Sequence, residues 1–370
     1  MTAAAPGRVD ALDQLRGLAI LGVVAVHVVG VAPSGLALAD ALLPFGRYGV
    51  QLFFAVSAYT MMMTWEQRAA AESHPAASFY VRRAARILPM FWLAIVLYLA
   101  LHGTGPSYFA PEGLGALQIA ATALTLHGWW PSAFNSVVPG GWSIAVEMTF
   151  YLVFPLLAAC AGSLAATWRL ACLAALVALA AEPLVAAWLH TAWSHYPPRL
   201  VDEFFHFWFP REAMFLFVGL VVYRTLHPGS DATTGRSAAW WALAWLPLAW
   251  FLLGRGEMAV AIVTGLFVVA YLRRPLLLPG LGSLGRRSYS IYLMHFAVLE
   301  ALRHLGWTDG QPSLAGCLGV FAATLGGSWL LAGLTVRLVE NPGIALGRRL
   351  AAWIERKPPG PLAARAQGQP

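Results

Sequence analysis

The chain has 370 residues, of which 59% are apolar and only 11% are charged, and its mean hydropathy is +0.65. Soluble domains carry roughly 25% charged residues, so this composition excludes a soluble protein and indicates an all-α, polytopic membrane bundle. The formal net charge of +7 comes almost entirely from arginine, and by itself it does not point to a nucleic-acid partner.

A membrane-spanning helix requires about 20 mostly apolar residues. Ten segments of the chain meet this requirement, whereas an eleventh apolar run, 114–128, is short and contains glycine. We therefore predict about ten spanning helices together with one short segment that does not cross. The predicted spans are 12–32, 44–64, 84–102, 143–162, 169–190, 211–226, 238–254, 257–272, 288–306 and 314–336.

The distribution of basic residues decides the orientation of these spans. With a cytoplasmic N-terminus and no crossing at 114–128, most of the 24 Lys and Arg residues face the cytoplasm, as the positive-inside rule requires. A crossing at 114–128 would invert every later loop, so this segment is predicted to be re-entrant or to lie in a cavity. The basic residues left outside are Arg47, Arg199, Arg211, Arg255 and Arg303.

This topology places both termini in the cytoplasm and divides the chain into two parts. Residues 1–342 are predicted to form the integral membrane domain. Residues 343–370 are rich in proline, glycine and alanine, and they are predicted to form a short, disordered cytoplasmic tail.

The first span, 12–32, contains two ionisable residues, Arg16 and His27. Eleven positions are close to three helical turns, so the two side chains share one face about 16 Å apart. Arg16 then lies near the cytoplasmic surface and His27 in the outer half of the membrane. Ionisable residues in a span are candidates for a functional site, although Arg16 alone is also explained by snorkelling and His27 alone by an interhelical hydrogen bond.

The segment YVRRAARILP, residues 80–89, places three arginines at the cytoplasmic end of the third span. Arg83 and Arg86 are three residues apart and therefore neighbours on a helix, with Arg82 beside them. Guanidinium groups bind phosphates in a bidentate manner, so the functional interpretation is a ligand with several phosphates. The alternative is a basic stop at a helix end.

The segment PGGWSIAVEMTFYLVFP, residues 139–155, carries Ser143 and Glu147 four positions apart on one helical face. The predicted orientation places them at the outer end of the fourth span, at the level assigned to His27. A carboxylate beside a histidine can orient a general base and stabilise its protonated form. A structural glutamate bonded between helices is the alternative.

The ninth span contains RRSYSIYLMHF, residues 286–296, in which Tyr289, Tyr292 and His295 recur every three residues. This polar stripe is a candidate substrate-binding surface, and interhelical packing explains it equally well. The sequence contains no metal-ligand spacing, phosphate-binding glycine loop or nucleophile elbow.

Together these motifs resemble the acyltransferase-3 family of integral membrane acyltransferases. The matching pieces are RGLAILGVVAVH, VQLFFAVSAY, RRAARILPMFWL, GGWSIAVEMTFYLVFP, SYSIYLMH and the closing VENP, and they occur in the family's order over residues 12–342. One departure is SAY at 57–59, where the family usually has Ser-Gly-Phe, which affects a close helix contact.

The resemblance implies a multi-pass enzyme of the bacterial cytoplasmic (inner) membrane, an O-acetyltransferase without a permanently bound cofactor. It implies that acyl-CoA, most commonly acetyl-CoA, is the cytoplasmic donor and that a glycan or glycolipid is the extracytoplasmic acceptor. Arg83 and Arg86 match the residues that contact the CoA moiety, and Arg16 and His27 match a pair required for activity.

Our hypothesis from this resemblance is that His27 is the general base for the acceptor hydroxyl and that Glu147 orients its imidazole. Ser143 belongs to the same candidate catalytic group, and Arg82 to the donor-binding group. An acyl-enzyme intermediate and direct transfer are indistinguishable in sequence. The rival interpretation is a transporter or flippase for a glycan or acyl intermediate, which predicts internal repeats; no convincing repeat is present.

Overall fold

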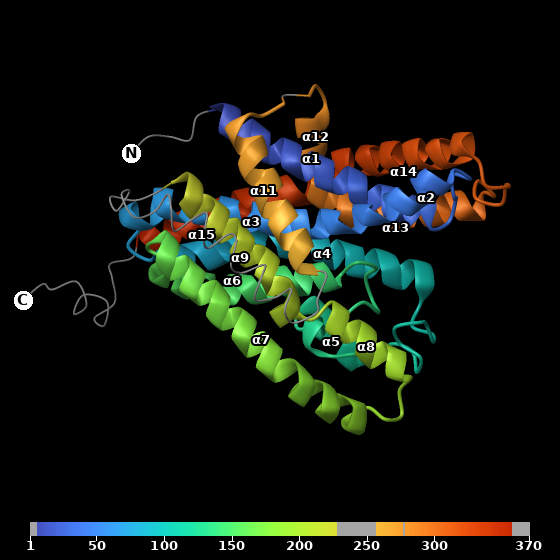
Figure 1. The fold of residues 1–370 in the computed structure, drawn as a ribbon, viewed down its shortest axis with the longest axis horizontal. Helices are drawn as coiled ribbons and strands as arrows, with labels where there is room; N and C mark the ends of the chain where they lie inside the picture. Colours follow the sequence, from blue (N-terminus) through green and yellow to red (C-terminus); the bar gives the residue numbers. More distant parts are fainter. Residues whose placement is uncertain (1–5, 228–256, 277, 357–370) are drawn as a thin grey trace, which may run out of the picture.

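The structure is a computed structural model that describes residues 6–227, 257–276 and 278–356. Regular secondary structure within these ranges is entirely helical, which confirms the predicted all-α class (Figure 1). The α-helices are α1 (Pro6–Val29), α2 (Ala37–Leu42), α3 (Gly49–Arg68), α4 (Pro75–His102), α5 (Ala116–Ala123), α6 (Trp142–Cys160), α7 (Leu164–Ala192), α8 (Pro198–His206), α9 (Phe209–Leu226), α11 (Glu257–Arg273), α12 (Leu281–Arg286), α13 (Ser288–His304), α14 (Leu314–Thr335) and α15 (Asn341–Glu355).

Nine of the predicted spans coincide with helices, and the tenth, 238–254, lies outside the described residues. Hydrophobic length explains this agreement, because a backbone inside lipid must satisfy its hydrogen bonds within its own helix. The total of ten spans stays a prediction. Six stretches of the described chain are each long and apolar enough to cross a membrane, namely Asp10–Val29, Pro75–His102, Trp142–Cys160, Leu164–Ala192, Pro198–Leu226 and Leu314–Glu355.

The short segment 114–128 does not form a helix long enough to span. It contains α5, whose eight residues extend about 12 Å against a hydrocarbon core of about 30 Å. His127 attaches the segment to the bundle, since its ring stacks on Phe91 of α4 and its Nε2 donates to the carbonyl oxygen of Gly141 at 2.9 Å. The expectation that 114–128 does not cross as a helix therefore agrees with the fold.

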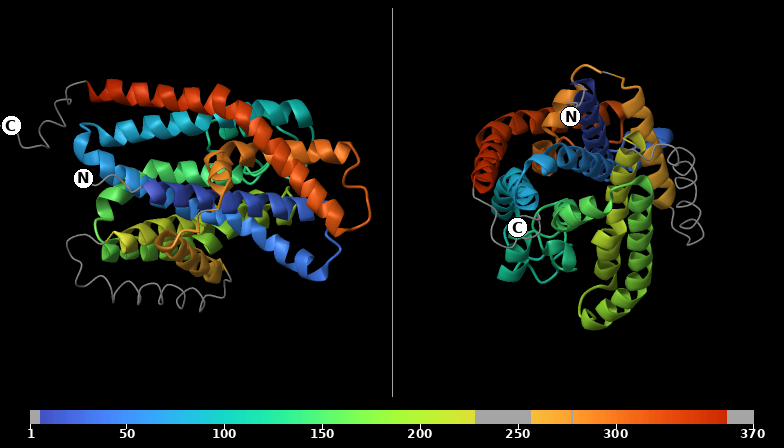
Figure 2. Two further views of the ribbon diagram at one scale, coloured as in Figure 1. Left: turned by 90° about the horizontal axis from the view of Figure 1, so that it is seen from above. Right: turned by 90° about the vertical axis from the view of Figure 1, so that its left-hand side faces the viewer.

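Most of the long helices run side by side along the long axis of the molecule (Figures 1 and 2). α1 packs against α3, α13 and α14, and α4 packs along α15. The start of α1 and the end of α15 lie at the same end of the bundle. Because the sequence predicts that both termini are cytoplasmic, we call this the inner end.

Small residues allow the first helices to pack closely. A Cβ atom added to Gly22 of α1 would lie 3.0 Å from the carbonyl oxygen of Gly46, and one added to Gly49 would overlap the carbonyl oxygen of Ala19. Glycine removes these overlaps, as it does at many interfaces between membrane helices. The close approach brings the Arg16 face of α1 against α3.

The C-terminal segment differs from its prediction. Residues 341–355 form α15, which continues from α14 through a π-helical segment, Val336–Glu340, so the described part of the expected tail is an ordered helix; residues 357–370 lie outside the described residues. The Pro/Gly/Ala composition suggested disorder, yet the glycines are what permit packing. A Cβ on Gly343 would overlap the carbonyl oxygen of Ala85 on α4, and one on Gly347 would lie 2.8 Å from the Cβ of Ala85.

Candidate active site

A cavity of about 390 Å³ lies between α1, α3, α4, α6, α13 and α15. Arg68, Ala69 and Glu72, at and after the end of α3, line it at the inner end, and Ser143 and Tyr292 line it farther into the bundle. The lining is strongly cationic, with six guanidinium groups and two carboxylates. The arginines are Arg16, Arg68, Arg82, Arg83, Arg86 and Arg348, and the acids are Glu72 and Glu147.

The three arginines predicted to bind the donor all line this cavity from α4. The Arg83 guanidinium lies over the rings of Phe79 and Tyr151, at 5.6 and 5.4 Å from their centroids. Arg82 makes a bidentate ion pair with Glu72, at 2.7 and 2.9 Å. Arg86 has no carboxylate within ion-pair distance among the described residues, so its charge is available to an anionic ligand.

Arg16 reaches the same cavity from α1. Its guanidinium donates to Asp13 at 3.1 Å and to the Thr60 hydroxyl on α3 at 2.9 Å. These two contacts hold the side chain between α1 and α3, and its charge adds to that of Arg83 and Arg86. The structure therefore brings together Arg16 and the arginines of α4, two motifs about 70 positions apart in the chain.

Ser143 and Glu147 both line the cavity, as their shared helical face predicts. The Glu147 carboxylate accepts hydrogen bonds from Ser57 on α3 and from Tyr151, the latter at 2.6 Å. The Ser143 hydroxyl donates within a buried group, to the Tyr292 oxygen at 2.9 Å or the Gly140 carbonyl at 3.0 Å. Glu147 thus belongs to the arginine-lined part of the site.

His27 lies beyond the cavity and beside a second histidine. Its ring centroid is 4.4 Å from that of Phe296 and 5.3 Å from that of His295. The expected pairing of His27 with Glu147 is therefore not present in the structure, because Glu147 bonds to Ser57 and Tyr151 instead. His27 lies on α1 and Glu147 on α6. The stagger between two helices depends on tertiary packing, so equal predicted depths do not bring these side chains together.

The polar stripe of α13 is divided between the cavity and His27. Tyr289 lines the cavity and donates to the Ile87 carbonyl at 2.8 Å, and Tyr292 lines it beside Ser143. His295 is fully buried, and its Nδ1 lies 2.6 Å from the Tyr292 carbonyl oxygen. A carbonyl only accepts, so Nδ1 carries the proton, and the buried Nε2 has no hydrogen-bond partner among the described residues.

Tyr151, Arg68 and Arg348 are among the cavity residues that were not predicted from the sequence. Tyr151 follows Glu147 by four positions, so helical spacing alone was a sufficient signal for it. Arg68 ends α3 and Arg348 lies on α15. Both were interpreted only as inward-facing basic residues, and no local pattern connects them to the arginines of α4.

Comparison with known proteins places these motifs in a family. The family model described as an acyltransferase domain matches residues 9–333. Nodulation protein 10 of Rhizobium leguminosarum is 28% identical over 341 residues, which cover 83% of this chain and 85% of that protein. The exopolysaccharide production protein ExoZ of Rhizobium meliloti is 30% identical over 318 residues, covering 82% and 91% of the two chains.

A third relative shares only part of its length with this chain. The peptidoglycan O-acetyltransferase OatA of Listeria monocytogenes is 29% identical over 163 residues, which are 40% of this chain and 24% of that protein. No solved structure matches the chain significantly. The family match covers most of the chain and includes the arginine and histidine motifs of α1, α4 and α13. This chain therefore belongs to the acyltransferase-3 family of membrane acyltransferases.

Proposed function

We propose that this acyltransferase moves an acetyl group from cytoplasmic acetyl-CoA to a hydroxyl of an extracytoplasmic glycan or glycolipid. The observation that carries the proposal is the cavity with six arginines, which begins at the inner end and extends into the bundle. The proposal includes the bacterial cytoplasmic membrane as its location, ten spans, and both termini on the inside.

The charge of the cavity supports a polyphosphorylated donor. Six guanidinium groups and two carboxylates line the cavity, and Asp13 pairs with Arg16, which leaves the positive charges in excess. A ligand with several phosphates compensates this excess charge, and charge-assisted bonds from arginine to phosphate are strong and directional. In the proposed complex, Arg83 and Arg86 bind the phosphates of CoA, with Arg16 at the same level of the bundle.

The far end of the cavity supports acyl transfer near His27. Tyr292 lines the cavity, its ring centroid is 5.8 Å from that of His295, and His295 in turn lies against His27. Arg16 and His27 are about 16 Å apart along α1. An extended thioester arm bound at the arginines is thereby directed toward the region of His27.

The proposed reaction is a single acyl exchange. The acceptor hydroxyl oxygen attacks the thioester carbonyl, a C–O bond forms and the C–S bond breaks. His27 takes the hydroxyl proton as general base and returns it to the leaving thiolate, so the products are the ester and free CoA. His295 packs against the His27 ring, and in this proposal it positions that ring in place of Glu147.

The proposed acceptor is a carbohydrate. Two relatives are named for exopolysaccharide production and for O-acetylation of peptidoglycan. The predicted outer surface also carries the exposed ring of Tyr108, whose hydroxyl donates to Glu203. Aromatic faces beside carboxylates suit the apolar faces and hydroxyl groups of sugars.

A donor assay with purified protein in lipid nanodiscs tests the first half of the proposal. We expect the wild type to release CoA thiol from acetyl-CoA when surface glycan from a deletion strain is added. The double variant Arg83→Gln/Arg86→Gln should lose most of this activity, whereas Arg169→Gln, an exposed arginine of α7 outside the cavity, should retain it. Unchanged activity in the double variant contradicts the proposed donor site.

Mass spectrometry of surface glycans tests the second half. We expect the deletion strain to lack an acetyl substituent that returns with the wild-type chain and does not return with His27→Ala. A transporter or flippase would instead change the amount of exported glycan without acceptor-dependent release of CoA. Full restoration of the substituent by His27→Ala would refute His27 as the general base.

A further inference from the structure

The arginines of the cavity extend from its inner end to the Arg16 side chain. Arg68, the last residue of α3, lies at the inner end, whereas Arg16 bonds to Thr60, eight residues earlier on the same helix. Eight residues correspond to about 12 Å along α3. Arg82 lies one turn nearer the inner end of α4 than Arg86. We call Arg68, Arg82 and Arg348 the mouth arginines, and Arg16, Arg83 and Arg86 the deep arginines.

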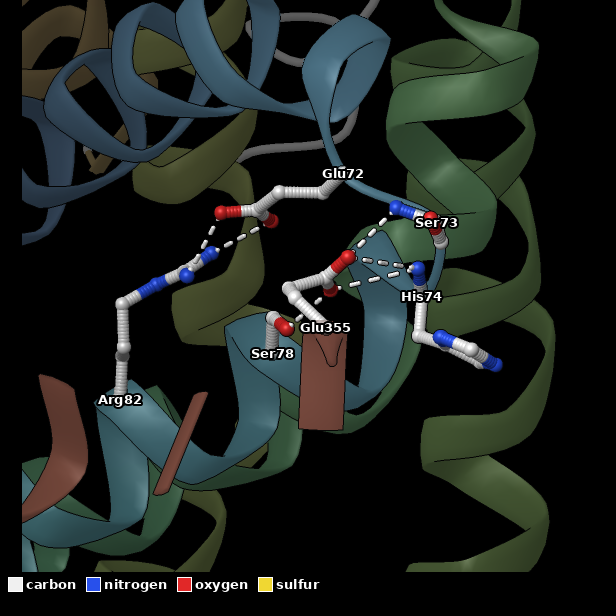
Figure 3. A network of polar contacts seen from close by, with 6 residues as sticks. All are labelled: Glu72, Ser73, His74, Ser78, Arg82 and Glu355. Atoms are coloured by element: carbon white, nitrogen blue, oxygen red, sulfur yellow. Dashed lines mark hydrogen bonds and ion pairs between the residues drawn. The ribbon is translucent and has the colours of Figure 1, made fainter. Parts of the chain in front are cut away.

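Arg348 belongs to this group because α15 is fixed against α4. Gly347, its neighbour, packs so closely that an added Cβ would lie 3.4 Å from the Cα of Arg82. At the end of α15, the Glu355 carboxylate accepts from the Ser78 hydroxyl at 2.6 Å and from the backbone N–H groups of Ser73 and His74 (Figure 3). Arg348 therefore lines the cavity from a helix that contacts α4 at Gly347 and the turn before α4 at Glu355.

The mouth carries a surplus of positive charge. Arg82 is paired with Glu72 (Figure 3), while Arg68 and Arg348 have no carboxylate within ion-pair distance among the described residues. Three guanidinium groups therefore face one carboxylate. A phosphate monoester carries a charge of about −1.5 to −2 at pH 7, which matches this surplus of two.

From these observations we infer that the mouth arginines form a second anion site, which recognises a phosphate monoester separate from the phosphates bound at the deep arginines. Arg68 and the Thr60 partner of Arg16 are about 12 Å apart along α3, so a ligand that contacts both ends of this row of arginines needs more than one anionic part. Coenzyme A has this chemistry, with a diphosphate next to the pantetheine arm and a phosphate monoester on the ribose. The inference rests on the proposed acyl-CoA donor, and it assigns donor specificity to Arg348 and Arg68.

Binding of two donors that differ only in the ribose phosphate tests this inference. Affinities of acetyl-CoA and 3′-dephospho-acetyl-CoA are measured by calorimetry on the full chain in nanodiscs of neutral phosphatidylcholine, so that no anionic lipid headgroup competes. We expect the wild type to prefer acetyl-CoA by about tenfold or more, the range for a hydrogen bond to a charged group.

Arg348→Gln should reduce this preference to about twofold or less while leaving the affinity for the dephosphorylated donor unchanged, the expected result for loss of one charge-assisted bond. Arg68→Gln should act in the same direction. The matched control is Arg349→Gln, the next residue of α15, which is exposed and does not line the cavity; it should retain the wild-type preference. Retained affinity for the dephosphorylated donor also shows that each variant is folded.

Two results would overturn the inference and are distinguishable from each other. If the wild type binds both donors equally, or Arg348→Gln weakens both by the same factor, the second anion site does not exist although the proposed donor stands. If the wild type binds neither donor, the acyl-CoA proposal itself is wrong and the anion site is wrong with it.

Discussion

The most sharply defined structural prediction concerns Glu355, whose carboxylate at the end of α15 holds the turn that precedes α4. His74, at the N-cap of α4, makes no side-chain capping bond. The Glu355 carboxylate accepts from the backbone N–H groups of Ser73 and His74 and from the Ser78 hydroxyl (Figure 3). Replacing Glu355 with alanine removes every one of these contacts.

The expected cost is about 2 kcal/mol, within the range for loss of hydrogen bonds to a charged group. This value corresponds to a factor of about 30 in a local opening equilibrium, because about 1.4 kcal/mol is tenfold. The amides of Ser73 and His74 should therefore exchange with deuterium about 30-fold faster in Glu355→Ala. Glu355→Gln keeps one acceptor without the charge, and it should give an intermediate increase of about fivefold.

Hydrogen–deuterium exchange with mass spectrometry on the full chain in nanodiscs measures this effect in peptides covering residues 72–79. Arg356→Ala is the matched control, since this exposed neighbour makes no side-chain bond to the start of α4 within the described chain, and its exchange should equal that of the wild type. Exchange in Glu355→Ala that is unchanged at residues 73–78 would refute this role of Glu355.

Three further changes have defined outcomes. His27→Ala should bind acetyl-CoA within about twofold of the wild type yet transfer at least about 100-fold more slowly, as loss of a general base predicts. Gly347→Leu should lower stability by about 1–3 kcal/mol through overpacking, because even a Cβ lies 2.8 Å from Ala85. Tyr292→Phe should cost about 1 kcal/mol, since its hydroxyl donates to the Gly140 carbonyl at 2.9 Å.

These outcomes are measured by donor calorimetry, single-turnover acetyl transfer and chemical denaturation in a fixed detergent. Ala345→Leu provides a control for Gly347→Leu, because Ala345 on the same helix already carries a Cβ and does not line the cavity. A Gly347→Leu protein as stable as the wild type would contradict the close packing of α15 on α4. Equal loss of binding and transfer in His27→Ala would indicate a structural role for that histidine.

The helices of this protein were predictable because their signal is local. A backbone inside lipid bonds within its own helix, so apolar length alone indicated α1, α4, α6 and α7. The common face of Arg83 and Arg86, and that of Ser143 and Glu147, followed equally from helical periodicity. Each of these features depends on residues within about one turn or one span of each other.

The segment after α14 shows where such reasoning fails. Its glycines were interpreted as a sign of disorder, whereas Gly343 and Gly347 pack against α4 at Ala85. The same residue type favours a flexible chain in water and close contact between helices in a bundle. Only the neighbouring surface decides between these outcomes, and that surface is absent from the local sequence.

Sequence alone therefore determined the membrane class, the helices, and the polar faces on each helix that carry arginine, histidine and carboxylate. The tertiary structure decided which of these faces meet. It placed Glu147 with Ser57 and Tyr151, His27 with His295, and Arg348 at the mouth of the cavity. The physical reason is that contacts between helices depend on their tilt and stagger, which are set by packing of distant segments.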